Sequence, residues 1–264
     1  MTVPSTPQQP APEGPAPARA VAQGNPSGLP LAPLPPLPPP NGPATLRSPV
    51  GLGKAVAALL GLVIATDLFA VWADYTLYGV AGDIRNALAG GGSLDALAQR
   101  ADRADALDAA AGVAQVAALV ATAVVYLIWF MRVRVNAEVF NPFGHTYSRS
   151  WARWGWFVPF VNLVRPRRIM GEIWDASRPA GEPAGQRIVG VWWAFWILRV
   201  AVDRIASSAM NKAETADATQ DAALQTLFAD AVDIVSAALA IVVVVRLTRM
   251  QDRKAHAGPA VAGV

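Results

Sequence analysis

One segment of the chain is 23 residues long and carries no charge. It runs from Ala109 to Met131 and is interrupted only by the polar residues Gln115, Thr122 and Tyr126. An α-helix needs about 20 mostly apolar residues to cross the hydrocarbon core of a bilayer. The segment is therefore predicted to span a membrane, and the rest of the chain has to be compatible with that environment.

Three further apolar segments are shorter or carry charge. Ala55–Ala73 has 19 residues with one aspartate, Ile188–Leu198 is an uncharged run of 11, and Ile234–Val245 is an uncharged run of 12. Beside the two spans predicted at Ala109–Met131 and Ala55–Ala73, four crossings are the simplest interpretation. The predicted fold is an all-α membrane protein, a bundle of four transmembrane helices at about residues 54–78, 107–131, 187–208 and 225–246.

Basic residues alternate along the chain in the way the positive-inside rule requires. The N-terminal segment, the middle loop and the C-terminal tail hold 16 of them, nine being arginines of the loop 132–187. The loops 81–106 and 205–229 together hold four. Both termini and the middle loop are therefore expected in the cytoplasm. The first apolar run is too long and too late for a cleavable signal, so we expect a multi-pass protein of the plasma (inner) membrane.

Residues 1–49 hold 16 of the 22 prolines and are expected to form a disordered cytoplasmic tail. Within this tail Pro30, Pro33, Pro36 and Pro39 recur every third residue, which matches the three-residue turn of polyproline II. Two interpretations stay open, a docking ligand for a cytoplasmic protein and a stiff spacer. The membrane domain is expected over residues 50–250, followed by a short basic tail at 251–264.

Charged residues inside the predicted spans form a candidate site. Counted from the basic residue at each helix end, Asp67, Arg199 and Asp233 lie at similar depths of about 18–20 Å. An unpaired charge at that depth costs several kcal/mol. Arg199 is therefore predicted to pair with Asp67, with Asp233 or with both, and Asp203 lies one turn further along its own helix. The layer is either a structural clamp or a site for a proton or cation. Aspartates nearer the outer interface are expected to be solvated, namely Asp74, Asp108 and Asp230.

Seven of the nine tryptophans lie between residues 151 and 196. The apolar stretch Trp154–Val164 is too short to span, so an interfacial or re-entrant segment is predicted at 151–177, ending in an amphipathic helix on the cytoplasmic surface. Its arginines would meet anionic lipid headgroups. The residues expected at the membrane interface, or at a ligand site, are Trp154, Trp156, Pro159, Asn162, Arg165, Pro166, Arg167, Arg168 and Trp174.

This segment resembles the hallmark of an uncharacterised family of four-helix bacterial membrane proteins, known only as a domain of unknown function. The matching features are Trp-Phe-x-Pro at 156–159, Asn-Leu at 162–163, a proline followed by basic residues at 166–168, the helix sequence Glu-Ile-Trp-Asp-Ala-Ser at 172–177, and the pair Trp192-Trp193. The resemblance covers about residues 55–250. It implies four spans and brings no known activity, substrate or cofactor.

Catalytic and metal-binding patterns are missing from the sequence. The chain has no cysteine, its two histidines are far apart, and neither a nucleophile elbow nor a phosphate-binding loop occurs. No enzyme activity, metal or cofactor is therefore expected. A net charge of +3 gives no reason to expect a nucleic-acid partner. Two hypotheses remain, a partner-binding or scaffolding module of the cell envelope, and a small transporter or channel component that uses the charged layer.

Overall fold

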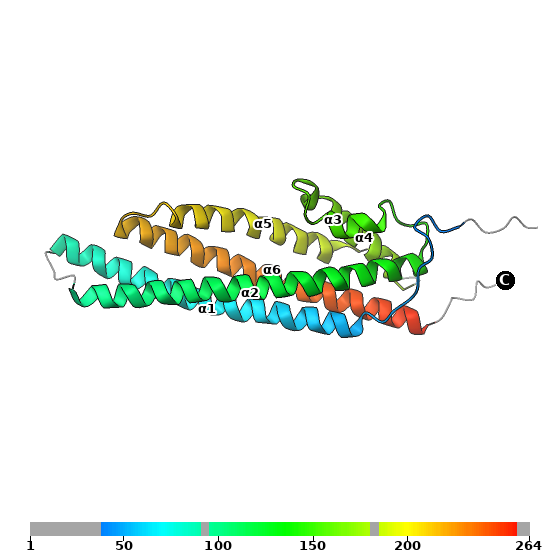
Figure 1. The fold of residues 1–264 in the computed structure, drawn as a ribbon, viewed down its shortest axis with the longest axis horizontal. Helices are drawn as coiled ribbons and strands as arrows, with labels where there is room; N and C mark the ends of the chain where they lie inside the picture. The colour runs from blue at the N-terminus through cyan, green and yellow to red at the C-terminus, as the bar shows by residue number, and fades with distance from the viewer. Residues whose placement is uncertain (1–37, 91–94, 180–184, 258–264) are drawn as a thin grey trace, which may run out of the picture. The chain divides into compact units, whose positions relative to one another are not determined.

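The computed structural model describes residues 38–90, 95–179 and 185–257, and these residues form helices and connecting turns. Four of the helices are long. They are α1 (Val50–Gly90), α2 (Asp95–Phe140), α5 (Arg187–Met210) and α6 (Ala216–His256), shown in Figure 1. We call the end where α1 begins and α6 ends the terminal end, and the opposite end the hairpin end.

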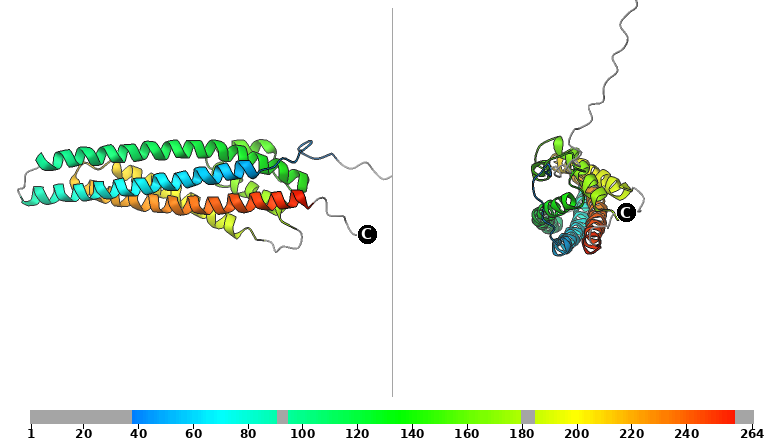
Figure 2. Two further views of the ribbon diagram at one scale, coloured as in Figure 1. Left: turned by 90° about the horizontal axis from the view of Figure 1, so that it is seen from below. Right: turned by 90° about the vertical axis from the view of Figure 1, so that its right-hand side faces the viewer.

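The long helices are arranged around two central members. α1 packs along both α6 and α2, and α5 packs along α6 (Figure 2). Because α2 lies on the side of α1 and α5 on the side of α6, α2 and α5 have no extensive contact with each other. This order leaves room between α2 and α5.

The packing of α1 follows a heptad pattern, in which buried residues alternate between steps of three and four. The buried positions that form this pattern are Gly53, Val56, Leu60, Val63, Asp67, Ala70, Asp74 and Leu77. Gly53 is required here, because a Cβ at this position would collide with the side chain of Thr248 on α6. The same pattern places two aspartates at interior positions of the bundle.

Three short helices connect α2 to α5 at the terminal end. They are α3 (Arg149–Trp154), the 3-10 helix η1 (Val161–Leu163) and α4 (Arg165–Ser177). Pro166 occupies the first turn of α4, where a missing N–H costs nothing. Both α3 and α4 contact α2, and α4 also contacts α6. The middle loop is therefore a folded cover on the bundle.

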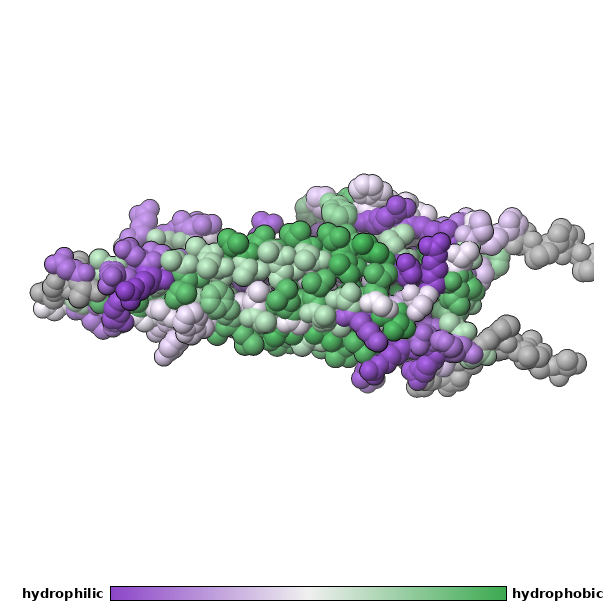
Figure 3. All heavy atoms as spheres, turned by 60° about the horizontal axis from the view of Figure 1, so that its bottom comes forward, coloured by the Kyte–Doolittle hydropathy of each residue, from purple (hydrophilic) through white to green (hydrophobic). Residues whose placement is uncertain are grey.

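Three helices are long and apolar enough to cross a membrane. They are α1, residues 97–140 of α2, and α6. α5 is not among them, because Arg199, Asp203 and Arg204 interrupt its 24 residues. The structure thus supports three of the four predicted spans by length and composition. On the face drawn in Figure 3, apolar side chains form a belt across the middle, and hydrophilic ones gather toward both ends.

The N-terminal segment differs from the prediction of a disordered tail up to residue 49. Pro30, Pro33 and Pro36 lie outside the described residues, whereas Pro39 is exposed in a turn closed by the hydrogen bond from Gly42 N to Pro39 O. Further along, the backbone of Arg47 is held by the side chain of buried Asn136 on α2. Its N–H donates to Oδ1 (3.0 Å) and its carbonyl accepts from Nδ2 (2.8 Å). Residues 38–49 therefore include a segment anchored to the bundle.

The apolar face of α4 also differs from expectation. Ile169, Met170, Ile173 and Trp174 are at most 5% exposed and belong to the main hydrophobic core. A face predicted to lie on the membrane surface is instead buried inside the protein. Burial against α2 and α6 removes this area from water as completely as a bilayer would.

Candidate functional site

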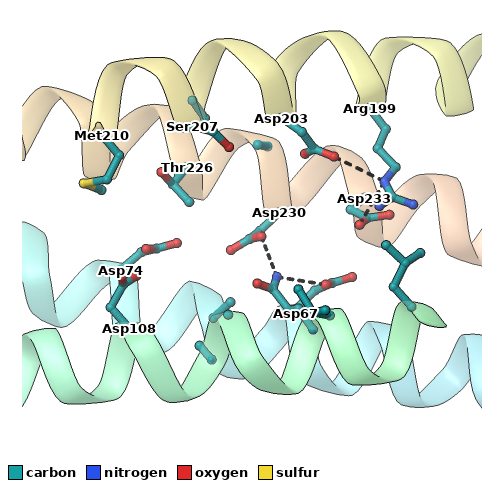
Figure 4. A pocket seen from close by; sticks show the side chains of 18 of the residues that line it. Asp67, Asp74, Asp108, Arg199, Asp203, Ser207, Met210, Thr226, Asp230 and Asp233 are labelled. Carbon is teal, nitrogen blue, oxygen red and sulfur yellow. Dashed lines mark hydrogen bonds and ion pairs between the residues drawn. The ribbon is translucent and has the colours of Figure 1, made fainter. Parts of the chain in front are cut away.

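A cavity of about 500 Å³ lies between α2 and α5, with α1 and α6 forming its floor. Its lining is rich in carboxylates from all four long helices (Figure 4). Among the described residues the charged side chains that line it are six aspartates and one arginine: Asp67, Asp74, Asp108, Asp203, Asp230, Asp233 and Arg199. We call it the acidic cavity.

Arg199 neutralises two of these carboxylates. Its Nε lies 3.1 Å from Oδ2 of Asp233 on α6 and 3.4 Å from Oδ2 of Asp203, one turn further along α5. Asp67 lines the same cavity but is held by a different residue, as Figure 4 shows. The arginine therefore fixes α5 to α6 and leaves the carboxylates nearer α1 and α2 without a cation of their own.

Gln115 of α2 bridges two of the remaining carboxylates. Its Nε2 donates to Oδ1 of Asp67 (3.1 Å) and to Oδ1 of Asp230 (2.9 Å). A side-chain amide has two N–H donors, so one glutamine can satisfy one oxygen of each acid. From the sequence, Gln115 was noted only as a polar interruption of an apolar run. In the structure Gln115 lies one turn from Ala111, which is buried, so its amide faces the interior of the bundle.

Three carboxyl groups each keep an oxygen without a partner. Asp67 and Asp74 are 1% exposed and Asp230 is 7% exposed. Within the described residues, Oδ2 of each has no hydrogen-bond donor. The expectation that Asp74 and Asp230 are solvated was wrong, because both occupy interior positions of their helices. Asp108 lies beside Asp74 in Figure 4.

The charges of the acidic cavity do not balance. After Arg199 is assigned to Asp203 and Asp233, four of the six aspartates remain without a counter-charge. Buried carboxylates are costly unless a cation, a proton or a donor compensates them. No group of metal-ligating side chains is found among the described residues. The arrangement therefore suits a positively charged group, or protons held by the carboxyl groups themselves.

An aromatic cluster lies on α2 and α5 toward the terminal end from this cavity. The cluster joins three parts of the chain, which are α2, α5 and the turn that follows α3. Its members are Tyr126, Phe130, Trp156, Trp192, Trp193 and Trp196. The rings of Trp193 and Trp196 stack with centroids 4.7 Å apart, and Trp156 meets Tyr126 edge-on at 5.4 Å. On the other side, the lining of the cavity reaches Met210 and Asn211 at the end of α5. The cavity thus extends along α5 from Arg199 to Asn211, and the cluster lies on its terminal side.

The residues predicted at the membrane interface have mostly internal partners. Arg165 lies 3.5 Å over the ring of Trp151, Arg167 donates to Oε1 of Gln186 (3.2 Å), and Arg168 donates to the hydroxyl of Tyr147 (3.3 Å). The backbones of Pro159 and Asn162 are bonded within the turn, to Val161 and Val158. Pro166 and Trp174 are buried, and Trp156 lies in the aromatic cluster. Among the tryptophans of this set, only Trp154 is strongly exposed, at 62%.

Glu172 of α4 is a titrating group outside the spans. Burial raises its pKa, but the ring of His145 and the N–H of Thr146 lower it by more, so that it lies below the ordinary value of 4.5. The Thr146 N–H donates to Oε1 at 3.1 Å, and Nδ1 of His145 lies 3.8 Å from Oε2. The ionised carboxylate therefore holds the loop before α3 against α4.

Long apolar helices that turn charged side chains inward define an integral-membrane class of protein. Within that class, residues 93–249, more than half of the 264, match the family described as "Domain of unknown function (DUF4328)", and the chain belongs to this family. The predicted resemblance to an uncharacterised family is thereby confirmed. Comparisons with curated proteins and with solved structures each found no match.

Proposed function

We propose that this protein is a four-span membrane protein that binds a small organic cation, a protonated amine, in the acidic cavity, as part of a carrier. The observation that carries the proposal is the set of three buried carboxyl oxygens, on Asp67, Asp74 and Asp230, that have no donor within the described residues. An ammonium group supplies up to three N–H donors and one positive charge. Each ammonium group placed beside one of these carboxyl groups would compensate its oxygen directly.

The size of the cavity supports a small molecule. Sites for small ligands commonly measure about 300–1,000 Å³. The acidic cavity, at about 500 Å³, falls in this range. Asp67 and Asp74 are seven residues apart on α1, which corresponds to about 10 Å along the helix axis. A molecule with two amino groups separated by a short apolar chain would match both carboxylates.

The fourth crossing is part of the proposal and rests on α5. Its 24 residues are about 36 Å long, enough for a hydrocarbon core of about 30 Å. Its charged residues Arg199 and Asp203 turn toward the cavity, while Val191, Leu198 and Ile205 are exposed. With the distribution of basic residues, this supports cytoplasmic termini and a location in the plasma membrane. The proposal includes no catalytic step.

A carrier must expose its site to each side in turn. The aromatic cluster is the barrier in the present conformation, because Trp196 lies one turn from Arg199 of the cavity. The reverse opening would separate α5 from α2 at these rings. α2 and α5 share no extensive direct contact beyond them, so the cluster is a suitable place for such a motion.

A partner-binding or scaffolding role is the second candidate. It is favoured by apolar rings at the terminal end that the bundle leaves uncovered, namely Trp154, Phe157 and Phe160, exposed at 62, 63 and 84%. The proline-rich segment up to residue 37 would add a docking ligand. Co-purification from gently solubilised membranes, with and without residues 1–37, tests this role. A partner lost on truncation supports it, and an identical set of partners removes the tail from it.

Cation binding is tested with full-length protein in detergent. The probe is butane-1,4-diamine, and its neutral control is butane-1,4-diol, with NaCl and MgCl₂ as inorganic controls. We expect saturable heat of binding and a higher melting temperature with the diamine alone. The variant Asp74→Asn/Asp230→Asn should bind at least about tenfold more weakly, since two charges facing the ligand are removed.

The matched control is Asp221→Asn, on the exposed surface of α6 outside the cavity, which should bind like the parent protein. Equal stabilisation by the diol, or equal affinity of the double variant, would overturn the proposal. Uptake of labelled diamine into proteoliposomes then separates a carrier from a receptor. A carrier shows uptake that Trp196→Ala changes, and a receptor shows binding without uptake.

A further inference from the structure

A second hollow, of about 840 Å³, lies at the terminal end between α2, α3 and the segment 43–47 that precedes α1. Its charge is opposite to that of the acidic cavity. Among the residues that the structure describes, its lining holds four arginines and no acidic side chain: Arg47, Arg132, Arg149 and Arg153. We call it the basic pocket.

Two of these arginines are held in place by the protein. Nε of Arg149 donates to Oε2 of Glu138 at 2.6 Å, and Nη1 of Arg132 donates to the carbonyl of Ser48 at 3.2 Å. Glu138 also accepts from Nη1 of the buried Arg134 at 2.7 Å. One carboxylate thus serves two guanidinium groups, and the surroundings of the pocket stay positively charged.

The other two arginines, Arg47 and Arg153, have exposed side chains and form no ion pair within the described ranges. The backbone of Arg47 is fixed by Asn136, as described above, so its position is set although its charge is free. Guanidinium groups bind phosphate oxygens with two parallel N–H donors. Four such groups around one hollow match a phosphate-bearing ligand.

The remaining wall of the basic pocket is apolar. Leu127, Ile128 and Met131 belong to the last turns of the uncharged segment of α2, and Trp154 and Phe157 stand opposite. Ile128 is 50% exposed and Phe157 63%. Along the pocket, apolar residues are followed by arginines. A bilayer has the same order, with acyl chains in its core and charged headgroups at its surface.

We infer that the basic pocket binds one anionic phospholipid, with its phosphate against the arginines and an acyl chain along α2. A soluble anion would use the guanidinium groups but not the exposed apolar wall. A zwitterionic lipid would use the wall but would bring a cation to four arginines. The ligand of the basic pocket is independent of what the acidic cavity binds.

Trp154 provides a local readout for the test. Full-length protein in mixed micelles is titrated with phosphatidylglycerol carrying dibrominated acyl chains, or with phosphatidylcholine carrying the same chains. Bromine quenches tryptophan at short range, and the part of the signal lost in Trp154→Phe is assigned to this pocket. We expect half-saturation with phosphatidylglycerol at a roughly tenfold lower mole fraction than with phosphatidylcholine.

The deciding variant is Arg47→Gln/Arg153→Gln, which removes two exposed arginines of the pocket that form no ion pair among the residues described and should abolish most of the preference. Its control is Arg246→Gln/Arg249→Gln. This variant removes two exposed arginines of α6 that lie toward the terminal end of the bundle but outside the pocket, and it should keep the preference. Equal quenching by both lipids, or equal losses in the two variants, would overturn the inference. Displacement of the lipid by excess inorganic phosphate would identify a soluble-anion site and overturn it as well.

Discussion

The acidic cavity and the basic pocket are lined by the same helix at positions only a few turns apart. α2 contributes residues 108–119 to the first and residues 127–135 to the second. The first collects six aspartates around one arginine, and the second collects four arginines beside one glutamate, among the residues described. In each, a single residue of the minority charge, Arg199 or Glu138, holds the site together.

The two sites are built in different ways. The acidic cavity is formed by interior positions of four long helices, so it depends on helix register. The basic pocket is formed by one long helix, one short helix and an anchored segment before α1, so it depends on side-chain contacts to irregular backbone. Removal of Arg199 should therefore destabilise the acidic cavity, and removal of Glu138 the basic pocket. Loss of the hydrogen bonds that hold the segment before α1 should affect the basic pocket alone.

The largest effect is expected for Glu138→Gln. Arg134 is fully buried and Glu138 is 4% exposed, so the change leaves a buried guanidinium without its carboxylate. Breaking such a pair costs about 3 kcal/mol of the free energy of unfolding. Denaturant unfolding in detergent, with Asp221→Asn as control, measures it. A loss below about 1 kcal/mol would contradict the assigned role of Glu138.

Arg199→Met should have the next largest effect, about 2 kcal/mol, because Arg199 is partly exposed and its partners Asp203 and Asp233 border a cavity. The double variant Arg199→Met/Asp233→Asn should recover part of this loss, since it removes a carboxylate left without a cation. Thermal unfolding of the single and double variants measures both. A single variant as stable as the parent would show that the ion pairs do not hold α5 to α6.

Asn136→Ala should release the segment before α1 with little effect on the acidic cavity. It removes both hydrogen bonds to the Arg47 backbone and leaves Oε1 of Gln251 without its donor. We expect a cost of about 1–2 kcal/mol. Trypsin cleavage after Arg47, followed by mass spectrometry, should be roughly tenfold faster. Asn141→Ala, in the exposed loop after α2, is the control and should leave this rate unchanged.

The smallest effect concerns Glu172 and pH. Because its pKa is lowered in the folded protein, its contribution to stability is complete above the ordinary value of 4.5 and is lost as pH falls through the lower folded value. Protection of the amides around Thr146, measured by hydrogen exchange and corrected for the intrinsic rate at each pH, should therefore decrease below about pH 4.5. Glu172→Gln should flatten this pH dependence, and an unchanged profile would contradict the contact.

The sequence predicted the helices better than their ends. Apolar length identified the spans of α1, α2 and α6, but their helices reach 41, 46 and 41 residues, because the flanking sequences are rich in alanine and continue the helix in water. α5 falls outside the set of apolar spans for a physical reason. Its Arg199 forms ion pairs with Asp203 and Asp233, and a count of apolar residues along the sequence does not include such pairing.

The candidate site was predictable only in part. Depth along each helix placed Asp67, Arg199 and Asp233 at one level, and they line one cavity in the structure. Depth near the outer interface predicts that Asp74 and Asp230 are solvated, but depth does not give the rotation of a helix, and both face the interior. The seven-residue step from Asp67 to Asp74 was the available signal, since it returns to the same face of a heptad.

The basic pocket and the burial of α4 inside the protein could not be predicted from the sequence, for a different reason. An amphipathic face predicts burial but not the partner, and Ile169 packs on protein as readily as on lipid. The anchoring of Arg47 by Asn136 joins residues 89 positions apart. No local pattern contains such a contact.

The length of α1 makes the protein suitable for measuring its own position in a bilayer. Its 41 residues extend about 60 Å, twice the thickness of a hydrocarbon core, so a helix of this length would project beyond the core by about as much as it spans. The chain has no cysteine. A single cysteine moved stepwise along α1 and treated with an impermeant thiol reagent would therefore map the two water boundaries residue by residue, with no background from native thiols.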